Sequence, residues 1–424
     1  MTTAFNRLRG RFLSEYGKLN LQVLTAFYSI PQTIILSWPA IRLRILPIVA
    51  RTRPHLRQIG LGLLVERDSR LPLYYSVYPG NMHDSRHFET VMDEMFGVVC
   101  GLHKTKERLT VVIDKGMNSE GNYAWIDEHS RIHFVTTYST YFAQELAAIP
   151  LDKFEPVDTA KNRRLVEDGK PEERMLAYRS KGQYWGKQRA VVITYNPGTA
   201  RKQLYTLESK LELIRQQLLE MRAKVREGAT HWRKSEAVKE RYLRLCERMH
   251  VASDLFVLEF DQSKQGLTMS FRKDVYKVSR KQHMFGKNII ITDNIDWTTQ
   301  QIVEASLDRW QVENRFRLSN DDEFVGMRPI RHWTDGKIRC HLFTGVVAMT
   351  YLRRLELRLL KAGIKRTAED VMDDMKHLHS VLTLQEGSRR PIRRLESPSK
   401  TQSEVLSAFG YYVDGGGVLQ IRPR

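Results

Sequence analysis

The sequence predicts an α/β protein in which a mixed sheet carries flanking helices and is interrupted by an inserted α+β domain. Two observations favour this fold class. In the first third of the chain, short apolar runs of strand length alternate with helical spacings of apolar residues. In the middle, a long heptad pattern indicates a helical hairpin with strands of its own on either side. The 424 residues allow two or three domains, or one domain with a large insertion.

The first part of the sheet is predicted as strand, strand, helix, strand, helix, strand. Gln58 to Val65 and Leu71 to Tyr78 are apolar runs of strand length, and Pro79-Gly80-Asn81 stops the second run. This order is typical of a mixed sheet with helices packed on it. The later elements are a helix at Ser85 to Val99, a strand at Leu109 to Ile113, a short helix at Asn122 to Glu128 and a strand at Ile132 to Thr137.

Residues 201–252 carry the spacing of a coiled coil. Apolar residues alternate steps of three and four until Gly228 breaks the pattern, and the same spacing resumes after it. This pattern favours a helical hairpin that packs on itself; a coil that joins two copies of the chain is the alternative. The apolar positions are Leu204, Leu207, Leu211, Ile214, Leu218, Met221 and Val225, then Val238, Tyr242, Leu245 and Met249. Strand-like runs flank the hairpin at Val191 to Thr194, Asp254 to Phe260 and Asn288 to Thr292, and they indicate an inserted domain.

Two further helices are expected before the end of the chain. His341 to Leu360 is long and mostly apolar, and the chain after Ala362 is polar and basic, so it reads as a tail with turns. Thr298 to Leu318 has a single stripe at 3.6 residues per turn. The stripe contains Ile302, Ser306, Arg309, Glu313, Phe316, Arg317 and Asn320.

The charge of the chain indicates a polyanionic partner. Lys and Arg total 68 against 49 Asp and Glu, which gives a net charge of +19 and a pI near 9.8. Cations neutralise phosphates and release counterions, so nucleic acid is the expected partner and a solvated basic surface is the alternative. The basic clusters are Lys161 to Arg164, Lys361 to Arg366, and Arg389, Arg390, Arg393 and Arg394.

The three cysteines exclude some classes of protein. Cys100, Cys246 and Cys340 lie far apart, which argues against a disulfide scaffold and against paired-cysteine zinc sites. A reducing, cytosolic compartment is therefore expected. We expect neither a signal peptide nor a membrane span, because prolines and arginines interrupt the apolar stretch Val23 to Ala50.

Two carboxylates stand where chemistry is expected. Asp114 ends a buried strand, where reactive side chains of a sheet converge, although an isolated Asp more often caps a turn. Glu313 could form an ordinary ion pair with Arg309 on the neighbouring helical turn. Arg317 lies on the same stripe as well, and a carboxylate between two arginines suits a site that holds a metal ion and phosphates. Carboxylates that converge from a strand and a helix can hold two Mg²⁺ or Mn²⁺ ions about 3.5–4 Å apart, an arrangement suited to phosphodiester cleavage and strand transfer.

Several segments resemble the insertion-sequence transposases of the DDE superfamily. They are RQIGLGLLV, LPLYYSVYPGNMHDS, VVIDKGMNSEGN, GKNIIITDN, DRWQVENRF and RPIRHWTDGKIRCHLF, which together span most of the chain from Arg57 onward. The resemblance implies an RNase H-like catalytic fold. It places the second catalytic Asp at Asp114 and the catalytic Glu at Glu313. In the family's Tyr-x2-Arg-x3-Glu-x6-Lys signature, Arg309 and Glu313 match, but Ser306 and Asn320 replace the Tyr and the Lys.

The resemblance also implies cofactors and partners. Asp114 and Glu313 would bind Mg²⁺ or Mn²⁺ in a two-metal site, and the substrate would be double-stranded DNA at the transposon ends and the target. A homodimer on DNA is expected because two ends must be brought together, and no membrane partner is expected. The residues expected to contact DNA are Arg309, Arg317, Lys115, Arg328 and Arg331.

The first catalytic Asp that the resemblance requires is missing. Before Asp68 the only acidic residues are Glu15 and Glu66, and Val23 to Arg53 has no clean periodicity and predicts neither a strand nor a turn. One hypothesis is that residues near Ser29 to Arg53 are translated in the wrong reading frame. A shifted frame permits Asp-Thr-Thr-Asn and then Arg-Gly-Lys-Asn-Lys, which the family resemblance places here; a genuinely divergent N-terminus is the alternative.

This interpretation divides the chain into five parts. They are residues 1–56, an N-terminal segment that is aberrant or partly out of frame; 57–140, the first part of the catalytic domain; 141–298, the inserted domain with hairpin 201–252; 299–362, the catalytic Glu helix and a packing helix; and 363–424, a basic C-terminal tail. Three functions fit: a DDE transposase impaired by the missing Asp, a non-catalytic DNA-binding remnant of one, or an unrelated coiled-coil nucleic-acid-binding protein. The first two require Asp114 and Glu313 to meet in space, and the third does not.

Overall fold

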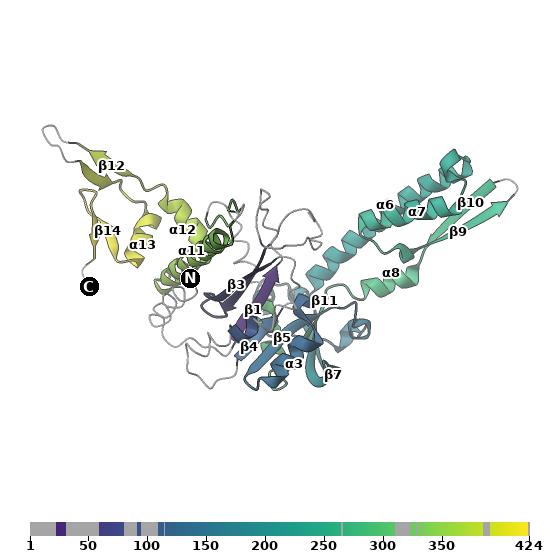
Figure 1. The fold of residues 1–424 in the computed structure, drawn as a ribbon, viewed down its shortest axis with the longest axis horizontal. Helices are drawn as coiled ribbons and strands as arrows, with labels where there is room; N and C mark the ends of the chain where they lie inside the picture. Colours follow the sequence, from purple (N-terminus) through teal and green to yellow (C-terminus); the bar gives the residue numbers. More distant parts are fainter. Residues whose placement is uncertain are drawn as a thin grey trace. The chain divides into compact units, whose positions relative to one another are not determined.

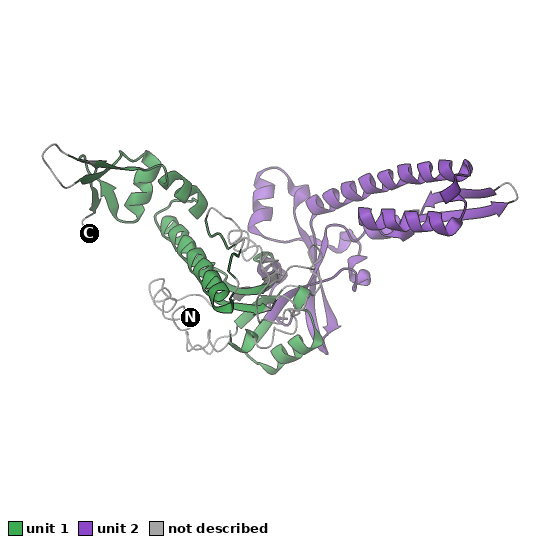
Figure 2. Ribbon diagram, turned by 45° about the horizontal axis from the view of Figure 1, so that its top comes forward, with its two compact units in different colours: residues 1–133, 307–424 green, residues 134–306 purple. Residues whose placement is uncertain are grey.

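The computed structural model has the α/β architecture that the sequence predicts (Figure 1). Its chain divides into two compact units, which Figure 2 distinguishes by colour: unit 1 comprises residues 1–133 and 307–424, and unit 2 comprises residues 134–306. The structure describes residues 23–30, 59–79, 91–94, 109–113, 115–263, 266–309, 324–327, 330–332, 334–384 and 391–422.

Unit 1 contains a mixed sheet. Its strands are β1 (Val23–Ile30), β2 (Ile59–Glu66), β3 (Pro72–Pro79), β4 (Leu109–Ile113) and the start of β5 (Ile132–Tyr138). The order across the sheet is β3-β2-β1-β4, where β2 is antiparallel to both of its neighbours and β1 is parallel to β4. The Leu109 N–H donates to the Arg131 carbonyl at 2.7 Å, so β5 begins beside the start of β4. The predicted mixed sheet is therefore confirmed.

Strand β1 corrects the prediction for the N-terminal segment. The sequence predicts no strand between Val23 and Arg53, but Val23–Ile30 forms a strand between β2 and β4. The strand is defined by its pairing with β2 and β4, and the periodicity of the segment does not reveal these partners. The remainder of that segment, residues 31–53, lies outside the described residues.

Strand β2 is buried along its whole length. Gly60 stands in it because a methyl group at that position would overlap the ring of Tyr78, which pairs with Gly60 on β3. The β2–β3 turn is closed by Glu66, whose buried carboxylate accepts the N–H groups of Asp68 at 2.9 Å and Ser69 at 2.6 Å. The connection between the two strands is thus fixed by its own hydrogen bonds.

Helix α11 (Asp335–Lys361) packs against β3 and corresponds to the predicted apolar helix. Arg353 is 5% exposed, and its Nε donates to the Ser69 carbonyl at 2.6 Å. The same guanidinium pairs with Glu356 at 2.7 Å. The helix is therefore locked to the β2–β3 turn through a buried cation. In the described part of the chain, no helix is long and apolar enough to cross a membrane.

Residues 363–424, expected to form a basic tail, contain folded elements. Val371 and Val405 form a small core with Leu359 at the end of α11. These elements are short, and polar and charged residues make up much of their sequence, which hides the few apolar positions that they bury. The elements are α12 (Ala368–Met375), β12 (Ser380–Thr383), β13 (Ile392–Leu395), α13 (Lys400–Ala408), β14 (Tyr411–Val413) and β15 (Leu419–Ile421).

Unit 2 contains the continuation of β5 and an antiparallel sheet. The strands are β6 (Glu155–Pro156), β7 (Leu176–Tyr184), β8 (Lys187–Tyr195) and β11 (Lys287–Thr292), in the order β5-β11-β8-β7-β6. Three helices belong to the same unit: α4 (Gln144–Ala147), α5 (Ala160–Glu167) and α9 (Thr299–Leu307). At the end of β11, Asp293 accepts the Phe134 N–H at 2.9 Å and so fixes β5 beside β11. Residues 141–298, the proposed insertion, all lie within this unit.

The predicted hairpin is present and packs on itself. It consists of α6 (Pro197–Arg226) and α7 (Ser235–Met249), which lie beside the two-stranded sheet β9 (Phe256–Ser263) and β10 (Gly266–Lys273) and the helix α8 (Val275–Gln282) (Figure 1). The heptad seam is buried against these elements; Ile214, Leu218 and Val238, for example, are fully covered. A coil that joins two copies through this seam is therefore wrong, because the chain's own residues cover the seam.

Candidate active site

The candidate site begins where β4 ends. All five residues of β4 are buried, and Ile113 pairs with Phe27 of the parallel strand β1. Asp114 follows Ile113 directly in the sequence and lies outside the described residues. Strand β1, VLTAFYSI, contains no carboxylate. The strand that neighbours β4 therefore offers no acidic partner to Asp114 along its length.

The loop after Asp114 is held by an internal network. Lys115–Met117 forms a single helical turn, and α3 (Glu120–Glu128) follows, capped by the Ser119 hydroxyl, which accepts the Asn122 N–H at 3.2 Å. Asn122 is 2% exposed, and its side-chain amide donates back to the Met117 carbonyl at 2.6 Å. These bonds fix the backbone that immediately follows Asp114, while the Lys115 side chain stays exposed.

The segment that would supply the catalytic Glu is described only at its start. Glu313, Arg317 and Arg328 lie outside the described residues, so whether Asp114 and Glu313 meet stays a prediction. The expected helix from Thr298 to Leu318 is wrong at one point: α9 ends at Leu307, and Asp308 and Arg309 form a turn. Arg309 is half-buried and Arg331 is exposed.

A tertiary ion pair lies directly after the end of the helix. The Asp308 carboxylate pairs with the Arg67 guanidinium in the β2–β3 turn. Nearby, burial and the Arg353 charge lower the pKa of Arg70, while Glu356 and Asp308 act in the opposite direction. This group of charged side chains has no signature in the sequence, because its members come from three distant segments. The pair anchors the start of the turn that leads toward Glu313.

The residues present do not complete a three-carboxylate metal site. No group of three Asp, Glu, His or Cys side chains in the described ranges could hold a metal ion. Asp114 and Glu313 could each offer hard oxygen ligands that suit Mg²⁺ or Mn²⁺, but β1 adds none. The donor set therefore falls one anionic ligand short of the site that the resemblance implies.

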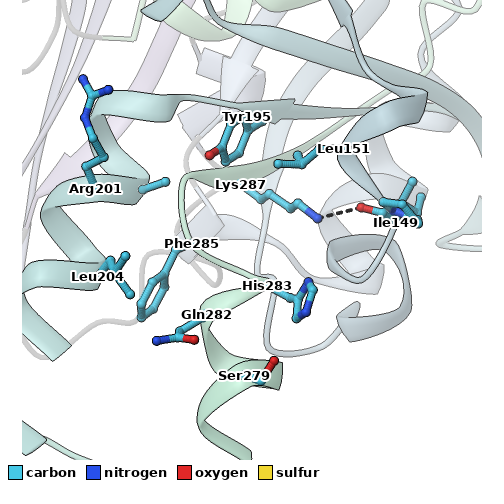
Figure 3. A pocket seen from close by; sticks show the side chains of 12 residues that line it. Ile149, Leu151, Tyr195, Arg201, Leu204, Ser279, Gln282, His283, Phe285 and Lys287 are labelled. Carbon is cyan, nitrogen blue, oxygen red and sulfur yellow. Dashed lines mark hydrogen bonds between the residues drawn. The ribbon is translucent and has the colours of Figure 1, made fainter. Parts of the chain in front are cut away.

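A cavity of about 540 Å³ lies in unit 2 and has a different character (Figure 3). Lys287 reaches into its wall and donates to the carbonyls of Ala147 at 2.6 Å and Ile149 at 2.7 Å. Burial lowers the pKa of this ammonium group. The other residues that line the cavity include Arg201 and His283, and none of the lining residues is a carboxylate. The cavity is thus unsuited to a divalent metal ion.

Comparisons with known proteins agree with the site's sequence motifs. The family model described as Transposase DDE domain matches residues 55–349. Among solved structures, a piggyBac transposase synaptic complex with hairpin DNA matches with a TM-score of 0.38 and 7% identity, over 84% of this chain and 51% of that one. A Mos1 transposase paired-end complex with the left transposon end matches with a TM-score of 0.20 and 9% identity, over 39% of this chain and 51% of that one.

The extent of these matches differs. The matches span about half the length of each of these two solved structures. No curated protein matches it. The family model, in contrast, covers more than half of the chain, including β2–β4, all of unit 2 and the first half of α11. This chain belongs to the transposase DDE domain family.

Proposed function

We propose that this chain is a DNA transposase whose capacity to cleave and join transposon-end DNA by metal-dependent phosphoryl transfer is impaired. The observation that carries the proposal is the parallel pairing of β1 with β4 together with the absence of any carboxylate on β1. The fold around the second catalytic position is retained, so DNA binding is expected to survive. Arg309, Lys115 and Arg331, with Arg317 and Arg328, are the cations proposed to contact phosphates.

The register of β1 supports one position for the missing carboxylate. Phe27 pairs with Ile113, and the next residue along each strand is Tyr28 and Asp114, so we propose that these two positions stand opposite one another. Residues paired across parallel strands project to the same face of a sheet, whereas neighbours along one strand project to opposite faces. The register therefore favours Tyr28 as the position for an Asp beside Asp114, whereas the shifted frame would place it at Ser29.

The shortfall in charge has a direct consequence. Divalent ions such as Mg²⁺ and Mn²⁺ are held by carboxylate charge, and two ions close together need several anionic ligands to offset their repulsion. Asp114 and Glu313 alone provide two carboxylates. We therefore assign no catalytic step to a metal ion in this chain, and we propose DNA binding with little or no strand cleavage.

Two single substitutions test the proposal. Tyr28→Asp should raise metal-dependent nicking of a supercoiled plasmid well above that of the original chain, and a second substitution, Glu313→Gln, should abolish the gain. Ser29→Asp is the matched comparison, because it adds the same charge one residue away on the opposite face, at the position where the shifted frame would begin with Asp. Rescue by Ser29→Asp alone would favour the shifted frame over the register argument. Equal rescue by both variants would contradict the register argument.

The non-catalytic remnant is the alternative function. The absence of a carboxylate on β1 favours this remnant as well. A remnant differs from an impaired enzyme in one expected result: no variant at Tyr28 would restore nicking, although DNA binding would remain. Rescue by Tyr28→Asp therefore decides between an impaired enzyme and a remnant.

The nucleotide sequence of codons 25–60 tests the reading-frame hypothesis separately. β1 ends at Ile30, close to Ser29, where the shifted frame would begin. Codons that permit Asp-Thr-Thr-Asn and Arg-Gly-Lys-Asn-Lys in the shifted frame would support a damaged transposase gene. Codons that exclude these residues would mean that the divergent N-terminus is genuine.

A further inference from the structure

The far end of the helical hairpin is a compact basic surface. We call residues 222–241 the hairpin tip; they contain the last turn of α6, the connection and the first half of α7. This stretch of 20 residues holds seven Lys and Arg against three Glu, so it carries four of the chain's +19 net charges. Charge at this density attracts polyanions.

The connection within the tip is rigid. Gly228 adopts a left-handed conformation with φ of 66°, and its N–H donates to the Val225 carbonyl at 3.0 Å, which ends α6. The Trp232 N–H donates to the Ala229 carbonyl at 2.8 Å, and the Arg233 Nε donates to the Gly228 carbonyl at 2.9 Å. The cations of the tip are therefore held on a fixed backbone.

Trp232 organises two of these cations. The Arg241 guanidinium lies 4.3 Å from the centre of its indole ring, and the Lys224 ammonium lies 5.4 Å from it. The ring itself is half-buried and packs against the core of the hairpin. Trp232 thus spaces cations at the surface rather than offering a free face to a ligand.

Other tip cations are not neutralised by carboxylates. Arg226, Arg233 and Lys234 are exposed, and none forms an ion pair in the part of the chain that the structure describes. The helix shafts differ, because Arg215 pairs with Glu212 at 2.8 Å and Arg244, just beyond the tip, pairs with Glu240 at the tip's edge at 2.5 Å. The positive charge is therefore concentrated at the tip rather than spread evenly along the hairpin.

We infer that the hairpin tip is a second, sequence-independent contact surface for the phosphate backbone of DNA. This inference rests on the proposed function, which supplies DNA as the polyanion. The tip offers Lys and Arg but no recognition helix or free aromatic face, so it contacts phosphates and reads no bases.

The length of α6 sets the reach of this contact. Helix α6 has 30 residues and begins two residues after β8 ends. At a rise of about 1.5 Å per residue it extends about 45 Å from the sheet of unit 2. With about 3.4 Å per base pair, this length corresponds to about 13 base pairs of DNA. A duplex of about 40 base pairs is therefore longer than the hairpin itself.

A salt titration with matched variants tests the inference. The tip variant carries Arg226→Gln, Arg233→Gln and Lys234→Gln. The control carries Arg201→Gln, Arg215→Gln and Arg244→Gln, which remove the same charge from arginines paired with Glu173, Glu212 and Glu240. Binding of each protein to a mixed-sequence duplex of about 40 base pairs is measured by fluorescence anisotropy at several salt concentrations.

The expected result is a change in slope for one variant alone. Each lost phosphate contact lowers the slope of log K against log salt concentration by about 0.9, so the tip variant should lose about 2.7 and the control less than about 0.9. Equal slopes for the two variants would overturn the inference. A full-length chain that fails to bind DNA at all would instead overturn the proposed function. If the triple variant unfolds at a lower temperature, Arg226→Gln alone is used, and its expected loss is about 0.9.

Discussion

Asn122→Ala should loosen the loop that follows Asp114 without unfolding the protein. The Asn122 amide is buried and donates to the Met117 carbonyl at 2.6 Å, so its removal leaves that carbonyl without its donor. An unsatisfied buried polar group costs about 1–3 kcal/mol. Because each 1.4 kcal/mol is a factor of ten, amide hydrogen exchange in residues 115–123 should become roughly 5- to 150-fold faster.

Asn162→Ala is the matched control for this substitution. Asn162 stands at the same point of a capped helix in unit 2, where the Thr159 hydroxyl accepts its N–H at 3.2 Å. Its side chain makes three bonds, to the Val157 carbonyl at 2.7 Å and to the carbonyl and N–H of Met175 at 2.8 Å. Asn162→Ala should therefore speed exchange more strongly, and in residues 157–175 alone. Unchanged exchange at 115–123 in the Asn122 variant, or equal acceleration in both regions, would refute the reasoning.

Three further substitutions probe the fold. Gly60→Ala should destabilise unit 1 by about 1–3 kcal/mol because the added methyl overlaps the Tyr78 ring; thermal unfolding would detect it. Arg353→Met should cost about 3–5 kcal/mol because it removes a buried cation from its pair with the largely covered Glu356 and leaves the Ser69 carbonyl without its donor, and adding Glu356→Leu should recover part of this loss in urea unfolding. Burial raises the pKa of Tyr242 above the value of about 10 that a tyrosine has in the unfolded chain. The neutral phenol therefore contributes its full stabilisation of the folded state below about pH 10, and this contribution is lost as the pH rises above that value. Tyr242→Phe should remove this alkaline loss and cost about 1 kcal/mol at neutral pH, because the phenol no longer donates to the Ser253 carbonyl; unfolding temperatures from about pH 8 to 11 would test both effects.

Elements with strong local patterns could be predicted from the sequence. Strands β2, β3 and β4 are apolar runs bounded by turn residues, and the hairpin α6–α7 carries a sustained heptad pattern. Each of these signals depends on neighbours in the sequence. Their positions agree with the structure because local propensity and tertiary packing favour the same conformation.

Elements decided by distant contacts could not be predicted. Strand β1 exists because β2 and β4 pair with it, and its own sequence has no alternation that distinguishes it from the residues that follow. The turn that follows α9 at Leu307 is tied to Arg67, which pairs with Asp308 from about 240 positions away along the chain. The bond of Arg353 to Ser69 joins residues 284 positions apart. No periodicity encodes such partners.

The candidate site was predicted only in part. Asp114 is correctly expected directly after a buried strand, since β4 ends at Ile113. Its proposed partner Glu313 lies outside the described residues, and their convergence stays a prediction. The shortage of a third carboxylate follows from the sequence, but the strand that should carry it could be identified only from the pairing of β1 with β4.

Cleavage of a supercoiled plasmid by the purified full chain in Mg²⁺, with Mn²⁺ as a second metal, tests the central claim most directly. The account predicts DNA binding, and nicking no greater than that of the Glu313→Gln variant, because β1 supplies no carboxylate beside β4. Strong metal-dependent nicking that Glu313→Gln abolishes would contradict it, since the chain would then possess a complete catalytic site without the first Asp.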